Sequence, residues 1–189
     1  MDEKTHSPDE LKVWRVNSRS KNISSEPVPQ TWLRLGGRGL IARILVDEVP
    51  AACEPLGPNN KLIFAPGLLV GHMLSSCDRI SIGGKSPLTG GVKEANAGGT
   101  TGLRLVLLGI KALIIEDKPD NKDWSILYIS HSGIKFETAD GLVGLGVFEC
   151  AKELVEKYGE KIAAAVIGQG GTQDHHHLLS MQARQNSSF

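Results

Sequence analysis

The sequence has few of the features that mark secreted, membrane or nucleic-acid-binding proteins. Only three of its 189 residues are cysteines (Cys53, Cys77 and Cys150), and they are far apart. They form no CxxC pair, so we expect no disulfide framework, a reduced cytoplasmic location, and cysteines that pack as small hydrophobic residues. The residues Lys and Arg number 21 and Asp and Glu also 21, which leaves no basic excess to attract nucleic acid.

Long apolar segments are also lacking. No apolar run approaches the roughly 18 residues that a membrane helix needs. The polar residues 1–10 do not resemble a signal peptide, and we expect a flexible N-terminus there. Neither a membrane nor nucleic acid is therefore an expected partner.

Glycine, in contrast, is abundant, at 22 of 189 residues, or about 12% against a usual ~7%. Residues 79–102 are polar and dense in glycine, and they also contain Arg79, Lys85, Lys93 and Asn96. Backbone amides near glycines, a guanidinium and an amide suit an anionic, polycyclic cofactor. A set of tight hairpin turns would have the same composition, so composition alone does not distinguish a cofactor-binding region from structural turns.

Hydrophobic periodicity predicts an α+β fold with mixed β-sheets and about three helices, near residues 38–48, 99–108 and 147–158. We place one domain at 11–171, a loop at 18–30, and a divergent or truncated tail without a completed element at 172–189. Strands are expected at 11–17, 61–65, 77–82, 92–95, 111–116, 124–130, 134–138 and 162–167.

Three short motifs look like functional sites but fail on spacing. Gly84-Lys85-Ser86 lacks the earlier glycine of a phosphate-binding loop, since Arg79 stands in its place. The glycines of 141–146 do not have the spacing of a dinucleotide fingerprint and indicate a loop before a helix. His175-His176-His177 is more typical of a solvated tail than of a metal site, because adjacent histidines rarely converge on one ion.

Several motifs, in order, resemble one family. Residues 85–90 (KSPLTG) and 95–99 (ANAGG) are similar to the signature of tungsten-containing aldehyde:ferredoxin oxidoreductases. Further similar segments lie at 14–17 (WRVN), 35–40 (LGGRGL), 54–63 (EPLGPNNKLI), 108–112 (LGIKA) and 167–168 (IG). The resemblance covers about residues 11–171 and implies the fold of that family's amino-terminal domain.

The resemblance also implies a cofactor and its ligands. In that family a tungsten or molybdenum ion lies between two pterin dithiolenes, and a magnesium ion bridges the pterin phosphates. By position, Arg79 would contact a phosphate, and Asn96 the phosphates and the magnesium. Ala97, Gly98 and Gly99 would give the cofactor room, Arg38 is a further candidate, and Lys85 would serve the loop's structure.

Family enzymes convert an aldehyde and water to a carboxylic acid, and a [4Fe–4S] cluster passes the electrons to ferredoxin. This chain diverges after residues 169–172, before the second pterin loop, and none of its cysteines matches a cluster ligand. We therefore expect a truncated pterin-binding domain that is not competent alone. The sequence shows no complete acid–base pair and no activated nucleophile, so we assign no catalytic residue. The alternative is a non-catalytic remnant or a binding module, which pairs with a separate catalytic subunit or forms a homodimer.

Strand alternation adds a geometric expectation. Arg79 and Ser81 should lie on one face of their strand, with Ile80 and Ile82 on the other. Asn96 precedes a double glycine at an expected helix start, so Arg79 and Asn96 should face one concave surface. In the alternative, Asn96 caps that helix and Arg79 pairs with a local acid, Asp78 or Glu94.

Overall fold

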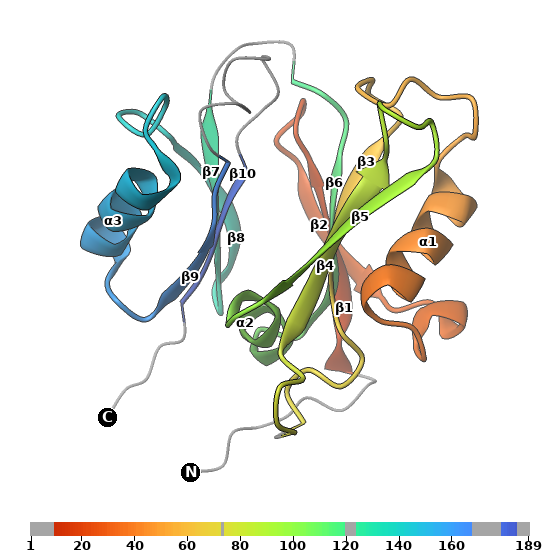
Figure 1. The fold of residues 1–189 in the computed structure, drawn as a ribbon, viewed down its shortest axis with the longest axis horizontal. Coiled ribbons are helices and arrows are strands. Elements are labelled where there is room, and N and C mark those ends of the chain that lie inside the picture. The colour runs from red at the N-terminus through yellow and green to blue at the C-terminus, as the bar shows by residue number, and fades with distance from the viewer. Residues whose placement is uncertain (1–9, 73, 120–123, 168–178, 185–189) are drawn as a thin grey trace. The chain divides into compact units, whose positions relative to one another are not determined.

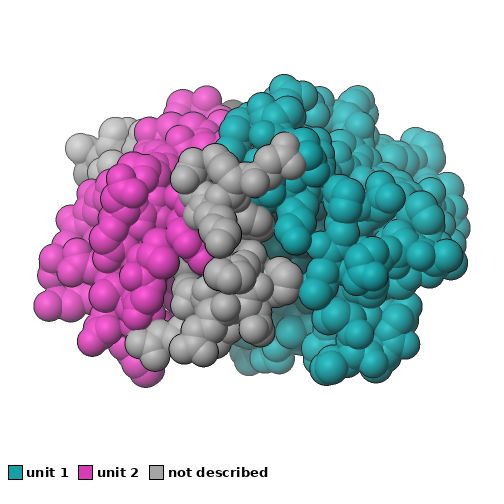
Figure 2. All heavy atoms as spheres, turned by 90° about the horizontal axis from the view of Figure 1, so that it is seen from above, with its two compact units in different colours: residues 1–119 teal, residues 120–189 magenta. Residues whose placement is uncertain are grey.

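A computed structural model of the chain describes residues 10–72, 74–119, 124–167 and 179–184, the last range by its backbone only. The chain divides into two compact units, Met1–Pro119 and Asp120–Phe189 (Figure 2). The sequence alone predicts one domain at 11–171, which spans parts of both units. Within the described ranges, no helix has the length and apolar character needed to cross a membrane.

The first unit contains a six-stranded mixed sheet with the strand order β2-β1-β6-β3-β4-β5. Strands β1 and β6 are parallel, and the other neighbours are antiparallel. Its elements are β1 (Lys12–Asn17), β2 (Ile23–Pro27), a short 3-10 helix (Gln30–Trp32), α1 (Gly37–Glu48), β3 (Lys61–Pro66), β4 (Arg79–Lys85), β5 (Val92–Gly98), α2 (Thr101–Leu107) and β6 (Ile110–Glu116).

The second unit contains a four-stranded sheet with the order β8-β7-β10-β9 and one helix. Strands β7 and β8 form an antiparallel hairpin, and β10 lies parallel to β7 and antiparallel to β9. Its elements are β7 (Ser125–Ser130), β8 (Gly133–Thr138), α3 (Val147–Tyr158), β9 (Ile162–Ala165) and β10 (Leu179–Arg184).

The predicted α+β class is confirmed, with mixed sheets and helices at 37–48, 101–107 and 147–158. Two strands were not predicted. Strand β2 occupies part of the expected loop at 18–30, and its mostly exposed side chains explain why no alternation marks it. Strand β10 lies in the tail for which we expected no element.

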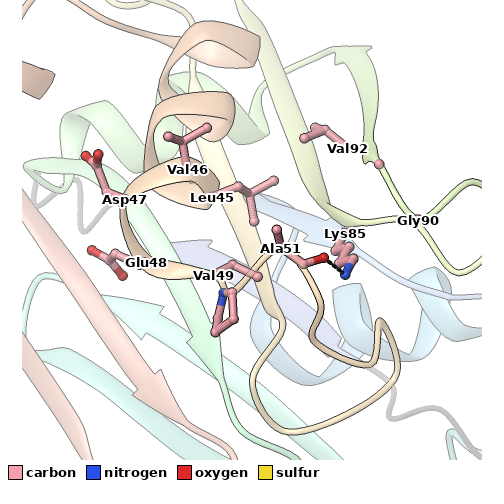
Figure 3. A pocket seen from close by; sticks show the side chains of 11 residues that line it. Leu45, Val46, Asp47, Glu48, Val49, Ala51, Lys85, Gly90 and Val92 are labelled. Atoms are coloured by element: carbon pink, nitrogen blue, oxygen red, sulfur yellow. Dashed lines mark hydrogen bonds between the residues drawn. The ribbon is translucent and has the colours of Figure 1, made fainter.

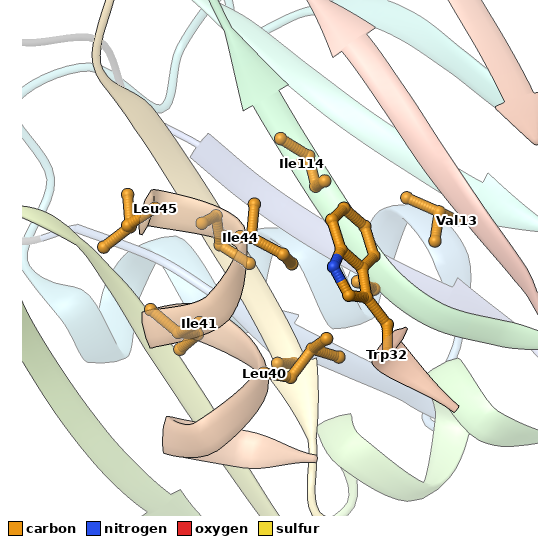
Figure 4. Packing of buried hydrophobic residues seen from close by; sticks show 10 residues of the cluster. Val13, Trp32, Leu40, Ile41, Ile44, Leu45 and Ile114 are labelled. Atoms are coloured by element: carbon orange, nitrogen blue, oxygen red, sulfur yellow. The ribbon is translucent and has the colours of Figure 1, made fainter. Parts of the chain in front are cut away.

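Helix α1 forms the core of the first unit on one face of the sheet (Figures 1 and 4). Its spacing places Leu40, Ile41, Ile44 and Leu45 on one side, where at most 5% of each residue is exposed. They pack with Trp32 and with strand residues that include Val13, Ile63 and Ile114. Burying one such side chain is worth about 1.5–3 kcal/mol, so this stripe fixes the helix on the sheet.

The entry to α1 lies against the loop that follows β3. A Cβ on Gly36 would lie 2.9 Å from Leu68 Cα, 3.0 Å from Gly67 C and closer still to the Leu68 nitrogen. Gly37 has a φ of +50°, and a Cβ there would lie 3.2 Å from Ser81 Oγ. Only glycine permits this backbone-to-backbone contact, which fixes where the helix starts relative to β4.

A cluster of charges joins the other end of α1 to the sheet. Arg15 donates hydrogen bonds of 2.7–2.9 Å to Glu26, Glu48 and Glu116, and Lys61 pairs with Glu48 and Glu116. The hydrogen bond with Glu48, together with the other two, raises the pKa of Arg15, although burial opposes this. In this cluster the charged side chains pair with one another, so their burial leaves none of the five without an opposite charge.

In the second unit, α3 packs Cys150 and Leu154 against Ile126. The end of α3 is joined to β8 by Glu137, which accepts a hydrogen bond of 2.5 Å from Tyr158 Oη and pairs with Lys135 and Lys157. The hydrogen bond from Lys135, with those from Tyr158 and Lys157, lowers the pKa of Glu137 to about 2.

We predict that Gly36→Ala destabilises the first unit by about 1–3 kcal/mol, because the new methyl group must displace backbone atoms. Gly39→Ala is the matched control, since its Cβ would meet only Leu35 Cδ2 at 3.9 Å and alanine favours a helix by up to about 1 kcal/mol. Urea unfolding of both variants measures the difference. Equal stability of the two would show that the Gly36 contact is not required.

We predict that Glu137 makes the stability of the second unit depend on pH. Its folded pKa lies below the ordinary value of 4.5, so its contribution is complete above about pH 4.5 and is lost as the pH falls toward 2. In Glu137→Gln this part of the acid dependence should disappear. Thermal unfolding between pH 6 and 2.5 measures it, and identical pH profiles for the variant and the wild type would contradict the prediction.

Candidate functional site

The β4–β5 hairpin presents one polar face. Its register pairs Arg79 with Gly98, Ser81 with Asn96, and Gly83 with Glu94. A Cβ on Gly83 would lie 3.0 Å from Ile41 Cγ2, so this is the face that α1 covers. Four polar side chains from two strands are therefore brought together beside the start of α1.

These side chains form a continuous row of hydrogen bonds. Arg79 Nε donates to Asn96 Oδ1 at 2.7 Å, Asn96 Nδ2 donates to Ser81 Oγ at 3.2 Å, and Ser81 Oγ donates to Glu94 Oε1 at 2.6 Å. Arg38, from the first turn of α1, donates from Nε to Glu94 Oε2 at 3.2 Å. We call Arg79, Asn96, Ser81, Glu94 and Arg38 the polar row.

Glu94 anchors the polar row. Its side chain is 10% exposed, and the hydrogen bond from Ser81, with that from Arg38, holds the pKa of Glu94 below its ordinary value although burial opposes this. The carboxylate is therefore ionised at neutral pH. It fixes the direction of the Ser81 hydroxyl, which then accepts from Asn96 Nδ2. Arg79 Nε can only donate, so both neighbours of Asn96 favour the same orientation of its amide.

The start of α1 next to this row lacks a negative partner of its own. The N-cap is Gly36, which has no side-chain hydrogen bond to give, and the first turn contains no acidic residue. The first N–H groups of a helix have no partner within it and favour an anion. Arg38 in that turn has a side chain that is 77% exposed, so its guanidinium remains accessible.

The double glycine at the end of β5 leaves space beside Arg79. A Cβ on Gly98 would lie 3.2 Å from Arg79 Nη1, so the missing side chain lets the guanidinium lie across the strand. Gly99 has a φ of +105°, which disfavours other residues, and open space surrounds the position of a Cβ. Ala97 is also exposed.

The structure brings together Arg79 and Asn96, as strand alternation predicts. The alternative interpretation is not observed. Arg79 donates its hydrogen bond to Asn96 and not to Asp78 or Glu94. Asn96 does not cap α2, because the N-cap of that helix is Thr100 and no side chain caps it. Asn96 lies within β5 and not at a helix start, so that part of the prediction is wrong.

The structure also adds two residues to the candidate site. Sequence analysis placed Ser81 on the face of Arg79 and named Glu94 as an alternative partner of Arg79, but assigned neither to the site. Their two-residue spacing from Arg79 and Asn96 was the available signal. Lys85 lies apart from the row: its Nζ donates to the carbonyl oxygens of Ala51 and Cys53, which fits the structural role expected of it.

A groove of about 630 Å³ lies at the opposite end of the hairpin (Figure 3). Its walls are the end of α1 with Leu45 and Val46, the following residues to Ala51, and the hairpin turn with Lys85 and Val92. It contains no member of the polar row. Among the described residues, no group of three or more His, Cys, Asp and Glu is placed to hold a metal ion, and all three cysteines are free. His175, His176 and His177 lie outside the described residues.

Comparison with known proteins identifies the family of this chain. Residues 13–186 match the family model described as aldehyde ferredoxin oxidoreductase, N-terminal domain. The chain belongs to this family. The predicted family resemblance is thereby confirmed.

Relatives are similar over most of this chain. It is 36% identical over 163 residues to the tungsten-containing aldehyde ferredoxin oxidoreductase of Pyrococcus abyssi, and 34% identical over 163 residues to that of Pyrococcus horikoshii. These alignments cover 85% of this chain but 26% of each relative, so the chain spans about a quarter of their length.

A solved structure shares the fold. The active site complex BamBC of benzoyl coenzyme A reductase, in complex with 1,5-dienoyl-CoA, matches with a TM-score of 0.84 and 25% identity. The match covers 96% of this chain and 32% of that one.

We predict that Gly98→Ala displaces the Arg79 guanidinium while the unit stays folded, because the new methyl group would crowd Arg79 Nη1. The Arg79 Nε–H signal in ¹⁵N NMR should then exchange with water faster as its bond to Asn96 weakens. Gly91→Ala, whose Cβ would meet only Thr89 Oγ1 at 3.6 Å, is the control. An unchanged Arg79 signal in Gly98→Ala would show that the glycine is not needed for this placement.

Proposed function

We propose that the first unit binds the phosphate end of a tungsten or molybdenum bis-pterin cofactor, as part of an oxidoreductase that converts aldehydes to carboxylic acids. The observation that carries the proposal is the polar row, in which Arg79 and Asn96 share one face of the hairpin beside the uncapped start of α1. Membership of the family and the names of the tungsten-containing relatives support the choice of cofactor.

The residues present fit such a group. Arg79 uses Nε on Asn96 and keeps its two terminal nitrogens for a phosphate, which a guanidinium can bind with two parallel hydrogen bonds. Arg38 and the N–H groups of the first turn of α1 add positive potential. Ala97, Gly98 and Gly99 leave the adjoining surface without large side chains, which suits the approach of flat pterin rings.

Asn96 would supply an oxygen ligand for magnesium. Its Oδ1 accepts one hydrogen bond, from Arg79, and an amide oxygen has a second lone pair for a hard cation. Ser81 would act on the cofactor through Asn96, since it accepts from the amide, and Glu94 would act through Ser81 and through Arg38, which both donate to it.

The chemistry would come from the bound group, which accepts the electrons of aldehyde oxidation, while this unit supplies position and charge. In the curated relatives, about three quarters of the polypeptide lies outside the matched region. We propose that an iron–sulfur cluster, the second half of the pterin site and the route to ferredoxin belong to polypeptide outside this chain.

A second candidate is a non-catalytic remnant or binding module that pairs with a separate catalytic subunit. The observation that favours it is the solved neighbour, which is described as the active site complex BamBC. The two candidates differ in whether the 189-residue chain carries cofactor.

We predict that the chain, produced in a host that makes the cofactor, purifies with tungsten or molybdenum and about two pterins per metal. Asn96→Ala should lower both contents severalfold with an unchanged circular dichroism spectrum. Asn59→Ala, at an exposed asparagine in the loop before β3, is the control and should keep both. Elemental analysis and pterin fluorescence measure the contents.

Two outcomes would contradict the proposal. Wild-type chain without metal or pterin supports the binding module or remnant. Equal cofactor content in Asn96→Ala and Asn59→Ala would remove Asn96 from the site. In neither case do we expect the isolated chain to reduce a viologen dye with an aldehyde.

A further inference from the structure

Lys111 is the one charged residue that the described part of the chain buries, with 8% of it exposed. It lies near the start of β6, and its Nζ donates a hydrogen bond of 3.1 Å to the carbonyl oxygen of Leu33. The described residues give the amine no other hydrogen-bond or ion-pair partner. An ammonium group has three N–H donors, so two remain unused.

A small cavity of about 100 Å³ adjoins this lysine. Its lining includes Lys111 and Leu33, the apolar side chains of Val70, Val106 and Ile110, and the exposed His72. None of the described residues that line it carries a carboxylate. Since a water molecule takes about 30 Å³ of liquid, the volume corresponds to about three water molecules, which limits the cavity to a small ligand.

A buried ammonium without a counter-ion is costly, so the group either loses its proton or acquires an anion. Burial lowers the pKa of Lys111. Among the described residues, His72 is the other titratable group that lines the cavity, and it is exposed. A bound anion would offset the cost of burial and favour the charged form of Lys111.

We propose that this cavity is a binding site for a short-chain carboxylate, with the carboxylate on Lys111 Nζ and the alkyl group against Val70, Val106 and Ile110. A carboxylate fits better than phosphate or sulfate, because those anions need many donors and the lining offers few. The cavity has no lining residue in common with the polar row, and the proposal does not depend on the proposed cofactor.

Saturation-transfer NMR on the 189-residue chain at pH 7.5, with sodium acetate as probe, tests the proposal. The acetate methyl group should receive saturation from the wild type. Lys111→Met should weaken binding at least about tenfold, because it removes a charged hydrogen-bond donor of similar length. Lys12→Met, at an exposed lysine of β1, is the matched control and should bind acetate as the wild type does.

The wild type alone gives a second measurement if Lys111→Met does not fold. With lysine labelled at Cε and Nζ, a saturating concentration of acetate should raise the pKa of Lys111, whereas chloride at equal ionic strength should not. Absence of methyl saturation in the wild type, equal binding by folded Lys111→Met, or an acetate-independent pKa of Lys111 would each overturn the proposal.

Discussion

The backbone contact between Gly36 and the Gly67–Leu68 loop is the constraint on which the candidate site depends. It fixes the first turn of α1 against the loop after β3, and Gly67 N–H in turn donates to the Arg79 carbonyl oxygen at 2.9 Å. Helix start, loop and strand β4 are thus joined through main-chain atoms. Since backbone geometry varies less than side-chain rotamers, Arg38 and Arg79 are positioned by rigid elements, as a binding site requires.

Within that frame the polar row acts as one unit. Each donor has one acceptor, and the groups at the two ends of the row set the directions of its hydrogen bonds. Arg79 can only donate, so Asn96 presents its oxygen to Arg79, and the ionised Glu94 can only accept, so the Ser81 hydroxyl donates to it and accepts from Asn96 Nδ2. Neutralising Glu94 would weaken its bond with Arg38 and allow the Ser81 hydroxyl to rotate, and the Asn96 amide would then be held by Arg79 alone.

The sequence predicts the parts of this arrangement that local patterns control. The stripe of α3 and the following Gly159 locate that helix to the residue, and alternation along β4 places Arg79 on the polar face. The pairing of Arg38 with Glu94 could not be predicted in this way, because the two residues are 56 positions apart in the sequence. It depends on the contact of Gly36 with the Gly67–Leu68 loop, and such a contact produces no periodic pattern in the sequence. Strand β2 was missed for a related reason, because its exposed, serine-rich residues acquire their conformation from pairing with β1.

The two ends of α1 differ in a way that favours an anion at one of them. At the carboxyl end, Glu48 is held by Arg15 and Lys61, and Lys85 binds the carbonyl groups of the chain that follows. Burial alone would raise the pKa of Glu48, but these cations outweigh it and lower that pKa, so the charges there are balanced within the protein. At the amino end, Glu94 is the one carboxylate that the described residues bring to this turn, and Arg38 and Ser81 already share it. Positive potential from the helix start and from Arg79 therefore remains without an internal partner among the described residues, and a ligand phosphate would satisfy it.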